Sequence, residues 1–153
     1  AKVMHEKLST VGGVDYDEAD EKFADALAKS LPNGIYNRAQ AFEIKPFETG
    51  QRGNGSTDVG DVSWTVPTVG LSTATWVPGT VAHTWQAVAA GGTPIGHKGM
   101  RVAAKAIAPP AATLFENPAP LVQARAEFHL RRGPNIQYEA LLGDREPTLD
   151  NRR

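Results

Sequence analysis

The sequence contains no cysteine, which excludes a disulfide, a cysteine-ligated metal and a cysteine nucleophile on this chain. It also lacks any apolar run near the roughly 20 residues that cross a bilayer. The first residues show none of the basic, apolar and cleavage regions of a secretory signal. We therefore expect a cytoplasmic protein with no membrane partner.

Neither sign of charge is in excess, because 16 Lys and Arg residues face 17 Asp and Glu residues. A chain this close to neutral offers no electrostatic reason to bind nucleic acid. The 41% hydrophobic and 22% charged content is typical of a globular protein rather than a disordered one. A length of 153 residues suits one domain, or a piece of one.

Common catalytic motifs are also missing. The chain has no Walker-type loop, no Gly-x-Ser-x-Gly and no His-Glu-x-x-His. The glycine-rich "GGTPIG" lacks the strand-turn-helix setting and the downstream acid of a dinucleotide site. Composition and motif spacing therefore exclude several classes of enzyme and nucleotide-binding site, but they do not identify a function.

Two helices are predicted near the start of the chain. The first begins with the chain and stops at Gly12-Gly13, and the second stops at Pro32-Asn33-Gly34. Either Asp15 or Asp17 caps the second helix. Its apolar positions follow a 3.6-residue period: Phe23, Ala26, Leu27 and Leu31.

The middle of the chain alternates loops with short elements. Residues 41–47 predict a short extended segment, followed by a flexible loop at "ETGQRGNGS". Residues 56–64 predict one or two helical turns capped by Ser56. Residues 68–77 predict a strand, because their composition is rich in Thr and Val and their polarity alternates. Pro78-Gly79 then marks a turn.

Two further helices are predicted after that turn. One spans residues 94–108, begins at Pro94 and is broken by Pro109-Pro110. The other covers residues 120–133, and its inward positions are Leu121, Ala124, Phe128 and Leu130. The fold class expected is α/β, helix-rich with a few strands.

Several side chains are candidates for chemistry, each with a plainer alternative. His83 follows the predicted strand, where a loop can present an imidazole to a ligand, but the plainer interpretation from the residues alone is a loop histidine bonded to backbone. Asp58 and Asp61 share a face if their segment is helical, so they could bind metal or orient a ligand histidine. The alternative is a helix start with Ser56 or Asp58 as N-cap.

Three tryptophans lie between residues 64 and 85: Trp64, Trp76 and Trp85. They could line a cleft for an aromatic or amphipathic substrate. Large aromatic side chains beside a sheet more often pack in a core, so we expect at least two of them to be buried.

Residues 55–105 resemble the M20 metallopeptidase and amidohydrolase family, in particular the aminobenzoyl-glutamate utilization protein B branch. The resemblance rests on "GSTDVGDVSWTVPT", on "TWVPGTVAHTWQAVAAGG" and on "IGHKGM" followed by "VAAKA". The tail "RRGPNIQYEALLGDREP" agrees less specifically. The combined pattern is much more specific than any single histidine.

The resemblance implies roles for particular residues. The family's catalytic domain is an α/β sheet with two divalent metal ions, Zn or Mn, and His83 of "VAH" matches a metal ligand. Ser56, Thr57 and Asp58 match a Gly-Ser-x-Asp loop, which lies near the substrate or behind the ligands. Asp61 matches no defined role.

The resemblance also implies that the rest of the active site lies outside this chain. The other metal ligands and the general-base Glu belong to the family's N-terminal half, so no catalytic residue is expected on this chain. We therefore expect residues 1–153 to be a C-terminal segment of one catalytic domain, with residues 1–14 leaving an absent lid and dimerization domain. The partner would be a larger chain carrying that half and the lid.

The implied reaction is hydrolysis of an amide bond by a metal-activated water. N-acyl amino acids or aryl amides such as aminobenzoyl-glutamate are the expected small-molecule substrates, and the assembled unit is expected to be a homo-oligomer. The alternative is a non-catalytic or regulatory subunit that keeps the scaffold. Three explanations of why the chain begins at Ala1 remain open: maturation of a longer chain, a separate subunit, and accidental proteolysis.

Overall fold

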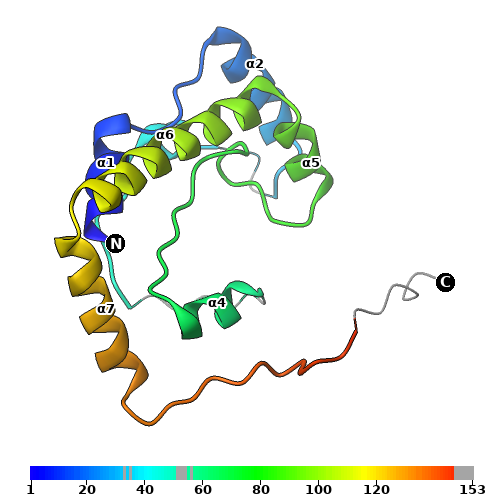
Figure 1. Cartoon of the computed structure of the whole chain (residues 1–153). Helices are drawn as coiled ribbons and strands as arrows, with labels where there is room; N and C mark the ends of the chain where they lie inside the picture. The colour runs from blue at the N-terminus through cyan, green and yellow to red at the C-terminus, as the bar shows by residue number, and fades with distance from the viewer. Residues whose placement is uncertain (33, 35, 51–54, 56, 147–153) are drawn as a thin grey trace. The chain divides into compact units, whose positions relative to one another are not determined.

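The computed structural model describes residues 1–32, 34, 36–50, 55, 57–146 of the chain. Within these residues the secondary structure is entirely helical, as Figure 1 shows. The helices are α1 (Lys2–Val11), α2 (Glu18–Ala28), α3 (Ala39–Phe42), α4 (Val59–Thr65), α5 (Trp85–Gly91), α6 (Pro94–Glu116) and α7 (Ala119–Arg132). None of these described helices is long and apolar enough to cross a bilayer.

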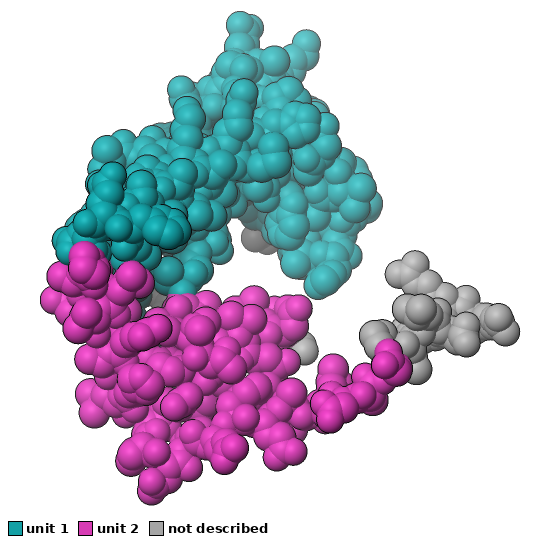
Figure 2. Space-filling model, in the orientation of Figure 1, with its two compact units in different colours: residues 1–51, 69–117 teal, residues 52–68, 118–153 magenta. Residues whose placement is uncertain are grey.

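The chain divides into two compact units, coloured separately in Figure 2. Unit 1 combines Ala1–Gln51 with Val69–Asn117, and unit 2 combines Arg52–Thr68 with Pro118–Arg153. Each unit is therefore built from two stretches that are distant in sequence. His83 belongs to unit 1, whereas α4 and its neighbours belong to unit 2.

Unit 1 contains the hydrophobic core. In this unit α6 packs against both α1 and α5. The largest fully buried side chains are Val14, Val77 and Ile95, which come from two loops and the first turn of α6. The cluster is completed by Tyr16, Ala24, Leu27, Ala41 and Ala90. Three of these eight residues are alanines, and at those positions the helices and loops of the core can approach closely.

The start of α2 is fixed by a reciprocal pair of side-chain bonds. The Asp20 backbone N–H donates to Asp17 over 3.0 Å, and the Asp17 backbone N–H donates to Asp20 over 3.1 Å. Of the two predicted caps, Asp17 is therefore the one used. Lys98 of α6 donates to both carboxylates, and its hydrogen bond holds the pKa of Asp17 below the usual value. This contact ties α6 to α2.

Two glycines let α6 approach its neighbours. A Cβ at Gly96 would lie 2.3 Å from the Gly91 carbonyl oxygen, and one at Gly99 would lie 2.5 Å from the Ala74 carbonyl oxygen. Both distances are far inside van der Waals contact. The glycines of "IGHKGM" are thus explained by close backbone packing.

The predicted strand over residues 68–77 is wrong, because this segment has no regular structure and no strand occurs among the described residues. A strand needs a partner for its backbone hydrogen bonds, and here the segment is held against a helix instead. The Thr73 hydroxyl donates to the Gly99 carbonyl of α6 over 3.0 Å. Local β-propensity was overridden by packing.

Two other boundaries differ from expectation. Ala41 and Phe42 are helical in α3, although residues 41–47 were predicted to be extended. The helix α6 continues through Pro109-Pro110 to Glu116 instead of breaking there. The fixed proline φ angle is compatible with a helix, and the Thr113 hydroxyl donates to the Pro109 carbonyl over 2.9 Å.

Unit 2 has no comparable core among its described residues. The helix α7 has no buried residue, and Leu121 and Leu130, predicted to face inward, are 44% and 82% exposed. Phe128 is half-buried, with the Arg132 guanidinium 5.0 Å from its ring centroid. The 3.6-residue period thus predicted the helix, but the described residues of the unit do not bury its apolar face.

Candidate functional site

The turn around His83 has an unusual backbone. His83 has φ of 62°, and it is the one non-glycine residue with positive φ among the described residues. Such a conformation is uncommon for a side chain with a Cβ, and it occurs preferentially where a residue is held for function. Thr84, the N-cap of α5, donates its hydroxyl to the Val81 carbonyl over 2.7 Å. The turn is therefore closed by its own hydrogen bond.

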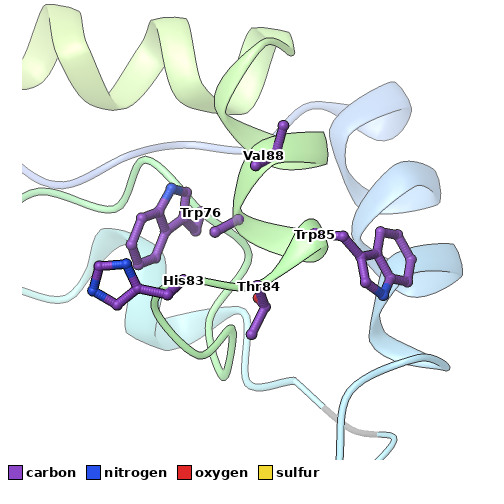
Figure 3. A pocket seen from close by; sticks show the side chains of 6 residues that line it. Trp76, His83, Thr84, Trp85 and Val88 are labelled. Carbon is purple, nitrogen blue, oxygen red and sulfur yellow. The ribbon is translucent and has the colours of Figure 1, made fainter. Parts of the chain in front are cut away.

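A shallow pocket surrounds this turn, shown from close by in Figure 3. Its lining residues are Trp76, His83, Thr84, Trp85, Ala87 and Val88. The His83 imidazole lies beside the Trp76 ring, whereas Trp85 points away on the other side of α5 (Figure 3). The pocket thus combines an imidazole with a largely apolar wall.

The imidazole of His83 is available to a ligand. His83 is exposed, and no described residue hydrogen-bonds or ion-pairs with its ring. The alternative of a loop histidine bonded to backbone therefore finds no such bond within the described residues. A neutral imidazole with accessible nitrogens is a common metal ligand.

The helix α5 holds this turn on the core of unit 1. Ala87 and Ala90 are buried, and the buried Gln86 donates from Nε2 to the Ser30 carbonyl just beyond α2 over 3.0 Å. On the outer side Trp85 is 62% and Val88 is 80% exposed. An anchored helix with apolar side chains outside is typical of a surface that meets another molecule.

The expectation that at least two tryptophans lie in a core is wrong. Trp64, Trp76 and Trp85 are 43%, 37% and 62% exposed. The predicted sheet that would have buried them is absent from the described residues, and aliphatic side chains with Tyr16 fill the core of unit 1 instead. Trp76 and Trp85 are among the residues that line the shallow His83 pocket, whereas Trp64 belongs to unit 2.

The Gly-Ser-x-Asp segment lies in unit 2, and Ser56 falls outside the described residues. Thr57 accepts a hydrogen bond from the Val59 N–H over 3.3 Å and donates to the Asp58 carboxylate over 3.4 Å. Asp58 occupies the N-cap position of α4 without a side-chain capping bond. The exposed Asp58 carboxylate therefore remains accessible to a ligand, while the Thr57 hydroxyl accepts the hydrogen bond from the first residue of α4.

A second group in unit 2 was not predicted. The Tyr138 hydroxyl donates to the Asp61 carboxylate, and the Tyr138 ring lies nearly parallel to the Trp64 ring, with 6.5 Å between centroids. This hydrogen bond raises the pKa of Tyr138 above its ordinary value. Asp61 and Tyr138 are separated by 77 residues, so no local pattern could bring them together. The only available signal was the less specific tail "RRGPNIQYEALLGDREP".

The described residues contain no group of three or more metal-binding side chains. His83 can supply one ligand, and a complete metal site needs others from outside these residues. His83 lies in unit 1, whereas Thr57 and Asp58 lie in unit 2.

Comparison with known proteins gave an informative match over part of the chain. Over 72 residues the chain is 44% identical to a subunit of the p-aminobenzoyl-glutamate hydrolase of Escherichia coli (strain K12). The match covers 47% of this chain but only 15% of that protein. No protein-family model matches the chain, and no solved structure matches it significantly. Over about half of its length, the chain is therefore similar to a subunit of a hydrolase.

Proposed function

We propose that this chain is part of a metal-dependent amidohydrolase of the M20 type that cleaves an amide bond. The expected substrates are N-acyl amino acids or aryl amides such as aminobenzoyl-glutamate. The observation that carries the proposal is the similarity to a subunit whose name specifies hydrolysis of p-aminobenzoyl-glutamate. The exposed imidazole of His83, held on a closed turn, supplies a suitable ligand.

His83 would hold one of two divalent ions, Zn or Mn. Its accessible ring, with no partner among the described residues, fits a ligand that is completed by another chain or segment. The chemistry that a divalent ion would supply there is polarisation of the amide carbonyl and a water acidic enough to attack near neutral pH. Trp76, which lies beside His83, would shield the imidazole from bulk water on one side (Figure 3).

The Gly-Ser-x-Asp segment would contact the substrate. Asp58 has an exposed carboxylate with no capping bond, so it can accept a hydrogen bond from an amide or amine N–H. Thr57 fixes the backbone beside it through its bond with Val59. We assign Ser56 to the same loop on the resemblance alone, since it lies outside the described residues.

The remaining metal ligands and the general base would come from a larger partner chain, with the assembled unit forming a homo-oligomer. The relative's name describes a subunit, which supports a partner. The exposed Trp85 and Val88 on α5 provide an apolar surface of the kind that packs against another chain.

The test is His83→Ala in the assembled protein, with His97→Ala as the control. Both histidines are exposed, but His97 lies on α6 outside the pocket. We expect His83→Ala to lose bound metal and at least about 100-fold in activity, on the order expected for a lost catalytic metal. His97→Ala should keep both. Metal content would be measured by elemental analysis and folding by thermal unfolding.

Two results would contradict the proposal in different ways. Retention of all bound metal by the His83 variant would refute the ligand assignment. An assembled wild-type protein without divalent metal and without amide hydrolysis would refute the reaction and favour the regulatory subunit.

A further inference from the structure

The turn from Val81 to Thr84 has a histidine where a glycine would be expected. Turns that need a positive φ at their third residue usually have Gly or Asn there. In this turn the third residue is His83, with φ of 62°. A side chain spans the turn, because the Thr84 hydroxyl donates to the Val81 carbonyl over 2.7 Å. The strained residue and this hydrogen bond therefore belong to the same four residues.

Packing by itself does not hold the left-handed backbone of His83. A left-handed conformation is unfavourable for a residue with a Cβ, and it persists only where the surrounding structure fixes it. The flanks of the turn are fixed, since Val77 is buried before it and α5 is anchored on the core after it. Val81, Ala82 and His83 are exposed. The bond from the Thr84 hydroxyl is thus the contact that spans the exposed part.

Helix capping does not explain the Thr84 side chain. Thr84 is the N-cap of α5, where a threonine hydroxyl usually accepts a hydrogen bond from a backbone N–H of the first helical turn. The Thr84 side chain makes no such capping bond. Its hydroxyl bonds to the Val81 carbonyl, on the side away from the helix. Removal of the hydroxyl should therefore affect the His83 turn more than α5.

We propose that Thr84 is a positioning residue: its hydrogen bond to the Val81 carbonyl holds His83 in the left-handed conformation that directs the imidazole towards a divalent metal ion. This inference rests on the proposed function and adds a residue to that site. Thr84 itself does not touch the metal ion. It acts through the backbone of the residue beside it.

The surroundings of the imidazole explain why the backbone has this role. A metal-bound histidine is usually oriented by a hydrogen bond from its second ring nitrogen. No described residue makes such a bond with His83. The Trp76 ring lies beside the imidazole and limits its directions on one side only (Figure 3). The direction of the imidazole therefore depends on the backbone conformation that Thr84 fixes.

Zinc dissociation constants of the assembled protein, measured by competition with a chelator, test the inference. Thr84→Val removes the hydroxyl but keeps the branched shape, and it should bind zinc at least about tenfold more weakly. Thr84→Ser keeps the hydroxyl and should stay within about threefold of the wild type. Thr80→Val is the matched control, because the buried Thr80 Oγ1 has no hydrogen-bond partner among the described residues. The control should bind zinc within about twofold of the wild type.

Two further measurements separate positioning from a general loss of stability. Crystal structures of the metal-free wild type and of Thr84→Val report the φ angle of His83, which should leave the positive region only in the variant. The visible spectrum of the cobalt-loaded protein depends on ligand geometry, so it should change in Thr84→Val and be restored in Thr84→Ser. Thermal unfolding of each variant measures stability.

Equal zinc affinity of Thr84→Val and the wild type would overturn the inference alone. An unchanged φ of His83 in that variant would do the same, as would lower thermal stability with an unchanged cobalt spectrum. A wild type that binds no zinc would refute the proposed function instead. The metal-free structures would then still decide whether Thr84 holds the turn.

Discussion

Replacing Gly99 by alanine should destabilise unit 1, although alanine is the better helix former. The new Cβ would lie 2.5 Å from the Ala74 carbonyl oxygen and 2.9 Å from the Thr75 Cγ2 atom. Ordinary contact begins about 1 Å farther out than the first of these distances. Because the closer atom belongs to the backbone, a side-chain rotation cannot relieve the clash, and the segment before Val77 must move away from α6.

The magnitude follows from three effects. Overpacking of this kind costs about 1–3 kcal/mol. The displaced segment also strains or loses the 3.0 Å hydrogen bond from Thr73 to the Gly99 carbonyl, which contributes about 1 kcal/mol. Alanine returns about 1 kcal/mol through its higher helix propensity than glycine. We expect a net loss of about 2 kcal/mol in the free energy of unfolding.

Urea unfolding followed by circular dichroism measures this loss, with Gly91→Ala as the control. Gly91 is also helical, but no heavy atom lies within 4 Å of its added Cβ. The control should be neutral or more stable by about 0.5 kcal/mol. The reasoning is refuted if Gly99→Ala is as stable as wild type, since the close approach of residues 73–75 to α6 would then be incorrect.

Two further predictions concern charged and titratable groups of unit 1. Lys98→Met leaves the buried Asp20 carboxylate without its cation and should lower the free energy of unfolding by about 3 kcal/mol. The hydrogen bond from Lys98 lowers the pKa of Asp17 in the folded state. The free energy of unfolding of the wild type should therefore fall as the pH drops below about 3.8. Acid unfolding curves of the Lys98 variant should show a smaller fall. Burial raises the pKa of Tyr16 to about 12, so its contribution should be complete below pH 10 and lost as the pH rises towards 12. Urea unfolding at about pH 9 and about pH 11 should show this loss in the wild type but not in Tyr16→Phe, and identical pH dependence in both would contradict the assignment.

Local signals predicted most of the helices well. The stop at Gly12 marked the end of α1, and the two acids before α2 limited its N-cap to Asp15 or Asp17. Pro94 marked the first turn of α6, as expected. These features depend on neighbours within one helical turn, so the sequence carries them directly.

The errors arose where distant contacts decide the structure. Residues 68–77 have strand-like composition, yet Thr73 bonds to α6 and no partner strand exists among the described residues. The inward face predicted for the last helix is exposed because burial depends on what packs against it. The helix α5 was not predicted, since it is short and its buried Gln86 is anchored beyond α2.

For the candidate site, the sequence alone selected His83, Asp58 and Thr57, because the motifs that carry the resemblance are local. Only the tertiary structure decided the exposure of the three tryptophans, the left-handed turn at His83 and the meeting of Tyr138 with Asp61. The physical reason is sequence separation. A cap, a turn or a helical period is fixed by residues within a few positions, whereas burial and side-chain pairing over 77 residues depend on how the whole chain packs.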